Sequence, residues 1–424
     1  MKKLTVIILL LAVLFGVSTA YIAAEVNSGK DKVSFEENVL YGDKTYANGI
    51  TLTMEANYKR KLNWKTDYTV GLSPKCETEY RFSAEGIPDD DREYYGIDIS
   101  ENIGDLKVVS DAYDEAVKTS KEEKRSVTVT LDLSDHIEYF PLFVYVDLPN
   151  FTLSYENQQR LIKKVNEFFK TPVPDNFNIT ITAEDEGTVT SIGYDAYTDT
   201  QFTGVAITPD TVFFTKGFTK FSPKDHDNTI YSINYGKDVI YEDTLKSAYD
   251  PGENFIISEM FATDKTLVLL GTDNDCETTF LQVLDIQTMN CIQNIKVSDS
   301  GYVSSRSKED FIEIETRNDS DDYEIYFYKL LPDNTYTHGM TVREKGDFFG
   351  DYITAIDFDG QHAVFAQAIH PHIAGSDAHF DVLLSVYDQS GRVYLGEYKC
   401  NLSKHNKSGY RLADYGYSLD VNMP

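Results

Sequence analysis

Residues 260–270 read MFATDKTLVLL, and residues 281–292 read LQVLDIQTMNCI. Each stretch is apolar or alternating over the length of a β-strand, and polar turn residues interrupt it. The same arrangement of an apolar strand pair and a polar hairpin turn occurs four times. The pairs are 205–214 with 230–240, 260–270 with 281–292, 303–315 with 326–336, and 355–365 with 384–393. The second half of the chain is therefore interpreted as a β repeat.

Equivalent points in the four units, Thr211, Thr266, Asp310 and His362, lie 55, 44 and 52 residues apart. A period of this length holds four strands, which is typical of propeller blades and not of helical repeats. Closing such an array needs a strand that joins the two ends. The segments 188–194 and 416–421 are the candidates, and they predict four or five blades.

Residues 283–288 (VLDIQT) and 386–393 (VYDQSGRV) resemble the hairpin of the broad β-propeller repeat superfamily. The resemblance covers roughly residues 200–400 and implies a propeller-like fold without cofactor chemistry. These hairpin turns need a residue that tolerates positive φ. Gly236 and Gly391 suit that need, and Asn290 and Asn334 are further candidates.

Residues 25–182 are predicted to form one α+β domain, an antiparallel sheet with a helix. Period-2 alternation indicates strands at 49–58, 62–70, 77–83, 126–133, 139–148 and 178–184. Ser154 is a predicted N-cap for a helix that ends before Thr171 and Pro172. Residues 111–125 are either a polar helix or a solvated loop. The polar stretch 185–187 suits a boundary, so a propeller-like domain is expected over 185–424.

The 424 residues carry a net charge of −30, with 69 acidic and 39 basic residues. Such an excess repels phosphate backbones, which excludes nucleic acid as a partner. A content of 41% apolar and 13% aromatic residues indicates a folded chain with charge on its surface.

Residues 1–24 are predicted to be either a cleaved signal peptide or an uncleaved membrane anchor. Lys2 and Lys3 precede an apolar run from Leu4 to Val17, and apolar character resumes as far as Ala24. Both outcomes place the remaining chain on the extracytoplasmic face of the membrane or outside the cell. Residues 42–71 also look like segments of uncharacterised signal-bearing proteins of Gram-positive bacteria, a similarity that implies the same location.

Four cysteines are too sparse for a disulfide scaffold in a chain of this length. Cys276 and Cys291 flank a predicted hairpin, but the expected turn near 287–290 places Cys291 opposite about Ile286 and Cys276 opposite about Gly301. They are therefore not predicted to be direct cross-strand partners.

One transition-metal site is predicted, with weak affinity. His370 and His372 flank a proline, and a turn at 374–376 brings Asp377 and His379 back toward them. Imidazole and carboxylate ligands suit Zn²⁺. Acidic clusters at 225–227, 273–275, 318–322 and 357–359 are read as turn chemistry, with weak Ca²⁺ binding as the alternative.

The sequence carries no nucleophile elbow, phosphate loop or zinc-protease motif. We therefore expect an extracytoplasmic, membrane-anchored, non-catalytic binding or sensing protein whose partner is a protein or a glycan. The alternative is an exported carbohydrate-active hydrolase or lyase with its site on a propeller face.

Overall fold

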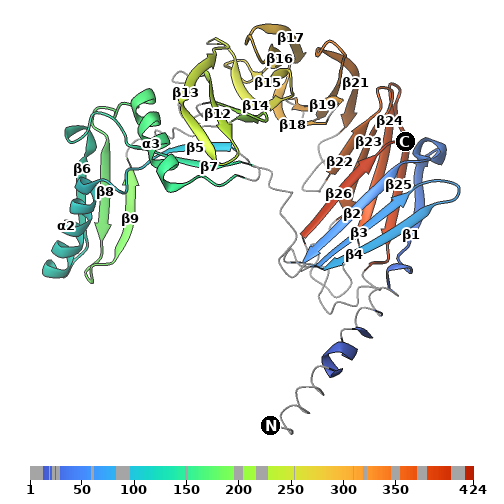
Figure 1. Ribbon diagram of the computed structural model, residues 1–424, viewed down its shortest axis with the longest axis horizontal. Coiled ribbons are helices and arrows are strands. Elements are labelled where there is room, and N and C mark those ends of the chain that lie inside the picture. The colour runs from blue at the N-terminus through green and yellow to red at the C-terminus, as the bar shows by residue number, and fades with distance from the viewer. Residues whose placement is uncertain are drawn as a thin grey trace. The chain divides into compact units, whose positions relative to one another are not determined.

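The structure is a computed structural model (Figure 1). It describes residues 13–18, 20–21, 24, 29–58, 62–82, 96–148, 151–194, 204–215, 228–252, 254–308, 310–318, 322–344, 354–369, 380–402 and 416–424. In these ranges the chain is mainly β, and the named sheets are antiparallel. The predicted fold class is confirmed at that level.

The chain divides into two compact units, which are described separately. Unit 1 comprises residues 1–91, 303–331 and 336–424, and unit 2 comprises residues 92–302 and 332–335. The predicted α+β domain over 25–182 is thus shared between the two units. The stretch 185–187, expected to mark a boundary, forms the hairpin turn between two paired strands instead. In that turn Gly187 has φ +79° and donates its N–H to the Glu184 carbonyl at 2.7 Å.

Unit 1 contains three sheets. The first has the order β26-β2-β3-β4, with bounds Gly416–Asn422, Thr51–Tyr58, Leu62–Thr69 and Lys75–Phe82. The second has the order β1-β25-β24-β23-β22, with bounds Phe35–Gly42, Gly391–Cys400, Phe380–Asp388, Ala363–Ile369 and Thr354–Phe358. The third has the order β18-β19-β20-β21, with bounds Gly301–Ser307, Phe311–Arg317, Tyr323–Leu330 and Tyr336–Glu344.

The two ends of the chain meet in unit 1. The C-terminal strand β26 pairs with β2 from Thr51↔Asn422 to Asn57↔Gly416, so a red strand lies beside the blue strands in Figure 1. Residues 416–421 were expected to close the repeat of residues 185–424, but they pair instead with β2, a strand that lies outside that repeat. The other candidate, residues 188–194, lies in a different sheet because it forms a hairpin with its immediate neighbour in sequence.

Unit 2 contains two four-stranded sheets. One has the order β10-β11-β12-β13, with bounds Val205–Ile207, Thr211–Thr215, Ile230–Gly236 and Val239–Tyr249. The other has the order β14-β15-β16-β17, with bounds Ile256–Ala262, Thr266–Thr272, Thr279–Asp285 and Cys291–Ser298. The described residues of the two units thus hold five antiparallel sheets of four or five strands, and sheets of this kind build propeller blades, so the fold is propeller-like.

The described part of unit 2 also contains two α-helices and two smaller sheets. The strands β5 (Gly96–Glu101) and β7 (Leu142–Asp147) form a two-stranded sheet, and β6 (Val127–Asp132), β8 (Asn178–Ala183) and β9 (Val189–Tyr194) form a three-stranded one. The helix α3 spans Tyr155–Phe169 and α2 spans Lys107–Glu123. The Ser154 side chain accepts the Asn157 N–H, which confirms the predicted N-cap. For residues 111–125, helix is the correct alternative up to Glu123.

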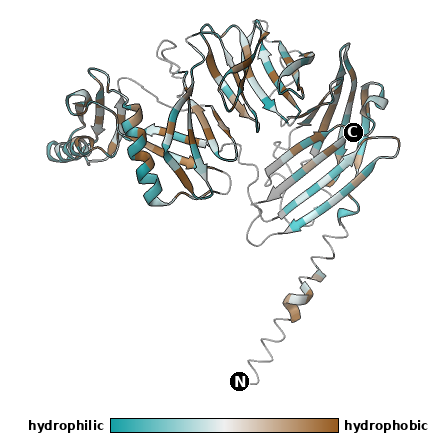
Figure 2. Cartoon of the chain, turned by 45° about the horizontal axis from the view of Figure 1, so that its top comes forward, coloured by the Kyte–Doolittle hydropathy of each residue, from teal (hydrophilic) through white to brown (hydrophobic). Residues whose placement is uncertain are grey.

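In unit 1 the two faces of strand β23 pack into two different core clusters. In β23 alternate residues point to opposite sides: Val364 and Ala366 join one core cluster, while Ala363 and Phe365 join another. A strand buried on both faces reads as a continuous apolar run, which is what residues 363–366 show. In Figure 2, hydrophobic residues (brown) and hydrophilic residues (teal) both occur along the strands.

The turn predictions are mixed. Gly391 (φ +120°) and Asn334 (φ +65°) adopt the expected positive φ. Gly236 does not, because its strand pairs as far as Gly236↔Val239 and the turn falls on the next two residues. In the 287–290 turn Met289, not Asn290, has positive φ.

A buried group of tyrosine hydroxyls lies between the first two sheets of unit 1. Tyr68 donates to the Glu37 carboxylate at 2.5 Å, and the hydroxyls of Tyr394 and Tyr398 lie 2.7 Å apart. Burial raises the pKa of Tyr68 and of Tyr398, and the Glu37 carboxylate raises both pKa values further.

We expect the protein to lose stability between about pH 10 and 12. Burial raises the pKa of Tyr328 and of Tyr336 to about 12, whereas tyrosine in an unfolded chain titrates near 10. The unfolded state therefore releases these tyrosine protons first. The contribution of the two protonated tyrosines to the free energy of unfolding is intact below about pH 10 and is lost as the pH rises toward 12.

Tyrosinate absorbance and melting temperature, followed together over this pH range, test the expectation. The melting temperature should fall steadily, and part of the tyrosinate signal should appear only when the protein unfolds. Complete titration in one step near pH 10, with native circular dichroism retained, would contradict it.

No helix among the described residues is long and apolar enough to cross a membrane. Most of the predicted anchor over residues 4–24 lies outside the described residues, so the anchor stays a prediction.

Candidate functional site

The predicted metal ligands His370, His372, Asp377 and His379 all lie outside the described residues. The weak Zn²⁺ site that they were expected to form stays a prediction. In the ranges that the structure describes, no group of three or more His, Cys, Asp or Glu side chains is placed to hold a metal ion.

Turn chemistry is confirmed at three of the four acidic clusters. Asp273 accepts backbone N–H groups from Glu277 and Thr278, and Asp359 accepts those of Gln361 and His362. In the third cluster the Asn318 side chain accepts the Asp322 N–H at 3.1 Å. The cluster at 225–227 lies outside the described residues.

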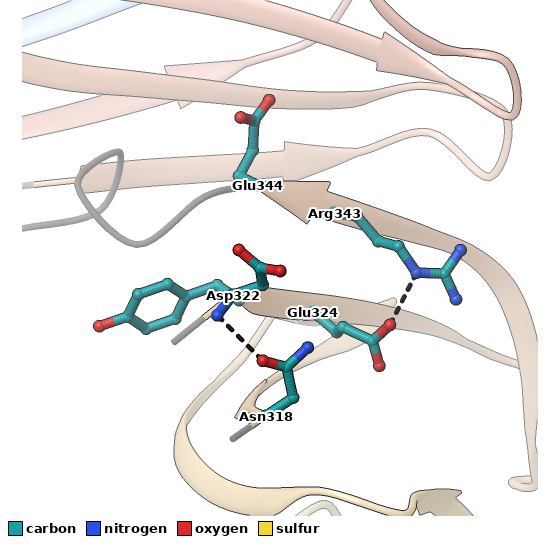
Figure 3. A pocket seen from close by; sticks show the side chains of 6 residues that line it. Asn318, Asp322, Glu324, Arg343 and Glu344 are labelled. Carbon is teal, nitrogen blue, oxygen red and sulfur yellow. Dashed lines mark hydrogen bonds and ion pairs between the residues drawn. The ribbon is translucent and has the colours of Figure 1, made fainter. Parts of the chain in front are cut away.

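The third acidic cluster opens onto a pocket in unit 1. The pocket has a volume of about 440 Å³ and lies where β19 and β21 end and β20 begins (Figure 3). Its lining residues are Asn318, Asp322, Tyr323, Glu324, Arg343 and Glu344. The β20–β21 register places Glu324 opposite Arg343 and Tyr323 opposite Glu344. Because neighbouring residues on a strand alternate in direction, these two pairs line different sides of the same strand ends.

Two donors hold the Glu324 carboxylate. The Arg343 Nε–H donates to it at 2.7 Å, and the Tyr326 hydroxyl donates to its other oxygen at 2.6 Å. Burial favours the protonated carboxyl, but these hydrogen bonds outweigh burial and lower the pKa of Glu324. Glu324 is therefore an ionised acceptor with a fixed orientation. The Arg343 side chain is 72% exposed and presents its outer guanidinium edge to solvent.

A second network holds Glu344. The Tyr387 hydroxyl donates to Glu344 Oε1 at 2.5 Å, and the Arg392 guanidinium pairs with the same oxygen. Arg392 also donates to the Tyr387 hydroxyl at 2.9 Å. Burial raises the pKa of Tyr387, and its hydrogen bond to Glu344 raises it further. The network connects the end of β21 to β24 and β25 of the neighbouring sheet.

The aromatic residue of the pocket is Tyr323. The Arg317 guanidinium lies over its ring at 5.4 Å from the centroid, a cation–π arrangement. The lining thus combines an aromatic ring, an amide, a guanidinium and carboxylates whose positions other residues fix. Such groups can bind a polar ligand by directed hydrogen bonds.

The sequence pointed to only part of this pocket. It singled out residues 318–322, but as a turn, and it missed Glu324, Arg343 and Glu344. A signal was present, because a hairpin turn centred near Asn334 places Glu324 opposite Arg343. The bonds from Arg392 and Tyr387 carried no comparable signal, since they come from another sheet.

The structure confirms that the two hairpin cysteines are not cross-strand partners, but it places Cys291 opposite Leu284 and not opposite Ile286. Cys291 pairs with Leu284, and an added Cβ at Gly301 would lie 3.0 Å from the Cys276 carbonyl oxygen. Both cysteines are exposed and free.

No family model matches the chain, and no curated protein matches it. Among solved structures, the chain aligns with Kuenenia stuttgartiensis hydrazine synthase at 11% identity and a TM-score of 0.26, covering 50% of this chain and 56% of the other. The Myceliophteria thermophila Cps50 (Swd1) β-propeller domain aligns at 8% identity and a TM-score of 0.26, covering 52% and 82%. The Dos1 propeller aligns at 11% identity and a TM-score of 0.30, covering 53% and 75%. The chain thus spans little more than half the length of the hydrazine synthase chain.

Proposed function

We propose that this chain is an extracytoplasmic, non-catalytic binding or sensing protein, tethered to the membrane by residues 1–24, whose ligand occupies the pocket at Glu324 and Arg343. The location rests on the apolar N-terminal run and on the resemblance of residues 42–71 to signal-bearing proteins. The binding role rests on the pocket itself.

The observation that carries the binding role is the state of Glu324. Glycoside hydrolysis needs a carboxylic acid that keeps its proton near neutral pH, which requires a raised pKa. Two donors lower the pKa of Glu324, so it is suited to accept hydrogen bonds and not to donate a proton. Glu324 therefore fits a hydrogen-bond acceptor for a ligand and does not fit the general acid of a hydrolase, whose second carboxylate would be ionised in the same way.

A thermal-shift screen of the full-length protein against a library of small polar compounds tests the proposal. At a concentration 100 times its Kd, a ligand adds about 2.7 kcal/mol of stability. We expect a ligand that raises the melting temperature of the wild type by several degrees and is recovered unchanged. The shift should disappear in Arg343→Ala.

Arg125→Ala is the matched control, because Arg125 is an exposed arginine that pairs with Glu123 and does not line the pocket. It should keep the full shift. Formation of a product that Glu324→Gln abolishes would replace the proposal with the hydrolase. A shift that survives in Arg343→Ala would remove the pocket as the site.

A further inference from the structure

Among the described residues, the two glutamates that line the pocket each have an arginine partner. Arg343 neutralises Glu324 at 2.7 Å, and Arg392 neutralises Glu344. The Arg317 guanidinium lies over the ring of Tyr323, the residue that follows Asp322 in the sequence. Both glutamates that line the pocket are therefore paired with an arginine.

Neutralised ion pairs still offer directed hydrogen bonds. A carboxylate oxygen that accepts from one arginine has further lone pairs, and an arginine that donates through Nε has further N–H groups. Donors and acceptors are thus both present in the pocket lining (Figure 3). A hydroxyl group donates and accepts at once, so a ligand with several hydroxyls can satisfy both kinds of group.

Building on the proposed binding function, we propose that the pocket takes an uncharged, polyhydroxylated ligand, that is, a neutral saccharide. On one side of the strand ends the Tyr323 ring supplies an apolar surface for the C–H face of a sugar. On the other side Glu324 and Arg343 supply partners for its hydroxyls. The volume of about 440 Å³ falls within the range of small-molecule pockets, so the occupant is a short saccharide.

Overall charge argues against an anionic ligand. The protein carries a net charge of −30, which repels anions over distances of several ångströms. Arg343 and Arg392 are both engaged with carboxylates. A cationic ligand would gain from the field of the whole protein, and its binding would weaken strongly with salt. Salt dependence therefore separates the ligand classes.

Calorimetry with nine matched sugars tests the proposal on the full-length protein. The probes are glucose, galactose and mannose, each beside its 2-amino form and its uronate, so that ring size is constant and only charge or stereochemistry changes. We expect at least one neutral sugar to bind with a Kd that changes less than twofold between 20 and 500 mM salt, an effect expected for uncharged ligands. Its charged forms should bind about tenfold more weakly, which corresponds to about 1.4 kcal/mol.

Variants assign the binding to the pocket. Tyr323→Leu removes the ring, and Glu324→Gln keeps the shape but removes the charge that orients Arg343. Each should weaken sugar binding about tenfold while Arg125→Ala leaves it unchanged, because losing one charge-assisted hydrogen bond or one stacking contact costs about that much. Unchanged melting temperatures exclude unfolding as the cause.

Three results would overturn the saccharide proposal. The first is strongest binding by an amino sugar with steep salt dependence, and the second is strongest binding by a uronate. The third is the absence of binding by all nine sugars. If the thermal-shift screen has meanwhile found a pocket ligand of another kind, the binding function stands and only the ligand class is wrong.

Discussion

Deleting residues 416–424 is expected to abolish the cooperative folding of unit 1. These residues form β26, whose Val421 is fully buried and whose Leu419 is 9% exposed. Burial of each such side chain contributes about 1.5–3 kcal/mol. The deletion also removes all seven pairings with β2. A typical domain has only about 5–15 kcal/mol of net stability, so the combined loss is close to the whole.

Polar contacts from Lys308 and Asp357 also hold β26 and the residue that follows it. The Lys308 ammonium lies 3.5 Å from the Asp420 carboxylate and donates to the Val421 carbonyl at 3.3 Å. The Asp357 carboxylate accepts the Met423 N–H at 2.6 Å. The deletion therefore leaves Lys308 and Asp357 without these partners.

Circular dichroism and the fluorescence of Trp64, which lies in the same sheet on β3, measure the effect. The deletion variant should show an exposed Trp64 already at 25 °C, and Val421→Asp should behave in the same way because it buries an unpaired charge. Asn422→Ser, an exposed change in the same strand, should leave stability within about 0.5 kcal/mol. A native melting curve for the deletion variant would show that β26 is dispensable.

Trp64→Ala is expected to destabilise unit 1 by about 3–5 kcal/mol, the cost of removing a large buried aromatic side chain. Trp64 is the only tryptophan, is fully buried, and packs against Tyr80 with ring centroids 4.9 Å apart in an edge-to-face arrangement. For a unit of about 200 residues, each kcal/mol lowers the melting temperature by about 2–4 °C. The expected fall is therefore about 6–20 °C.

Trp64→Phe is the matched control, because it keeps an aromatic ring in contact with Tyr80 and leaves a smaller cavity. It should cost less than half as much as the alanine variant. Calorimetric melting of both variants tests whether Trp64→Phe is less destabilising than Trp64→Ala. A fall in melting temperature of less than about 2 °C for Trp64→Ala would show that neighbouring side chains fill the cavity.

Local features of the chain were readable from sequence because neighbouring residues produce them. Ser154 caps α3 since its hydroxyl lies three residues before the N–H that it accepts. Gly391 takes positive φ because the hairpin around it requires that conformation. Alternation predicted β2, β3 and β8 within a few residues.

The stretch 185–187 illustrates the limit of that information. A polar glycine-bearing segment suits a linker and a tight turn equally well, and only the partners of the flanking strands distinguish them. Ile181 and Ile192 face each other across the β8–β9 pair, so the segment is a turn. The contacts of Arg392 and Tyr387 with Glu344 could not be predicted for the same reason, because these two residues belong to another sheet.

The sequence by itself determined the class of structure: a mainly β chain with a polar, acidic surface, one strongly capped helix and repeated hairpins. Strand period, caps and turns depend on contacts between residues close in the chain, so the local sequence pattern predicts them. Only long-range packing could show that residues 51–82 share a sheet with the C-terminal strand and that Tyr387 and Arg392 of another sheet hold Glu344 at the pocket. Antiparallel strands of similar alternation can pair with many partners, and the choice among them depends on the burial and packing of the whole unit.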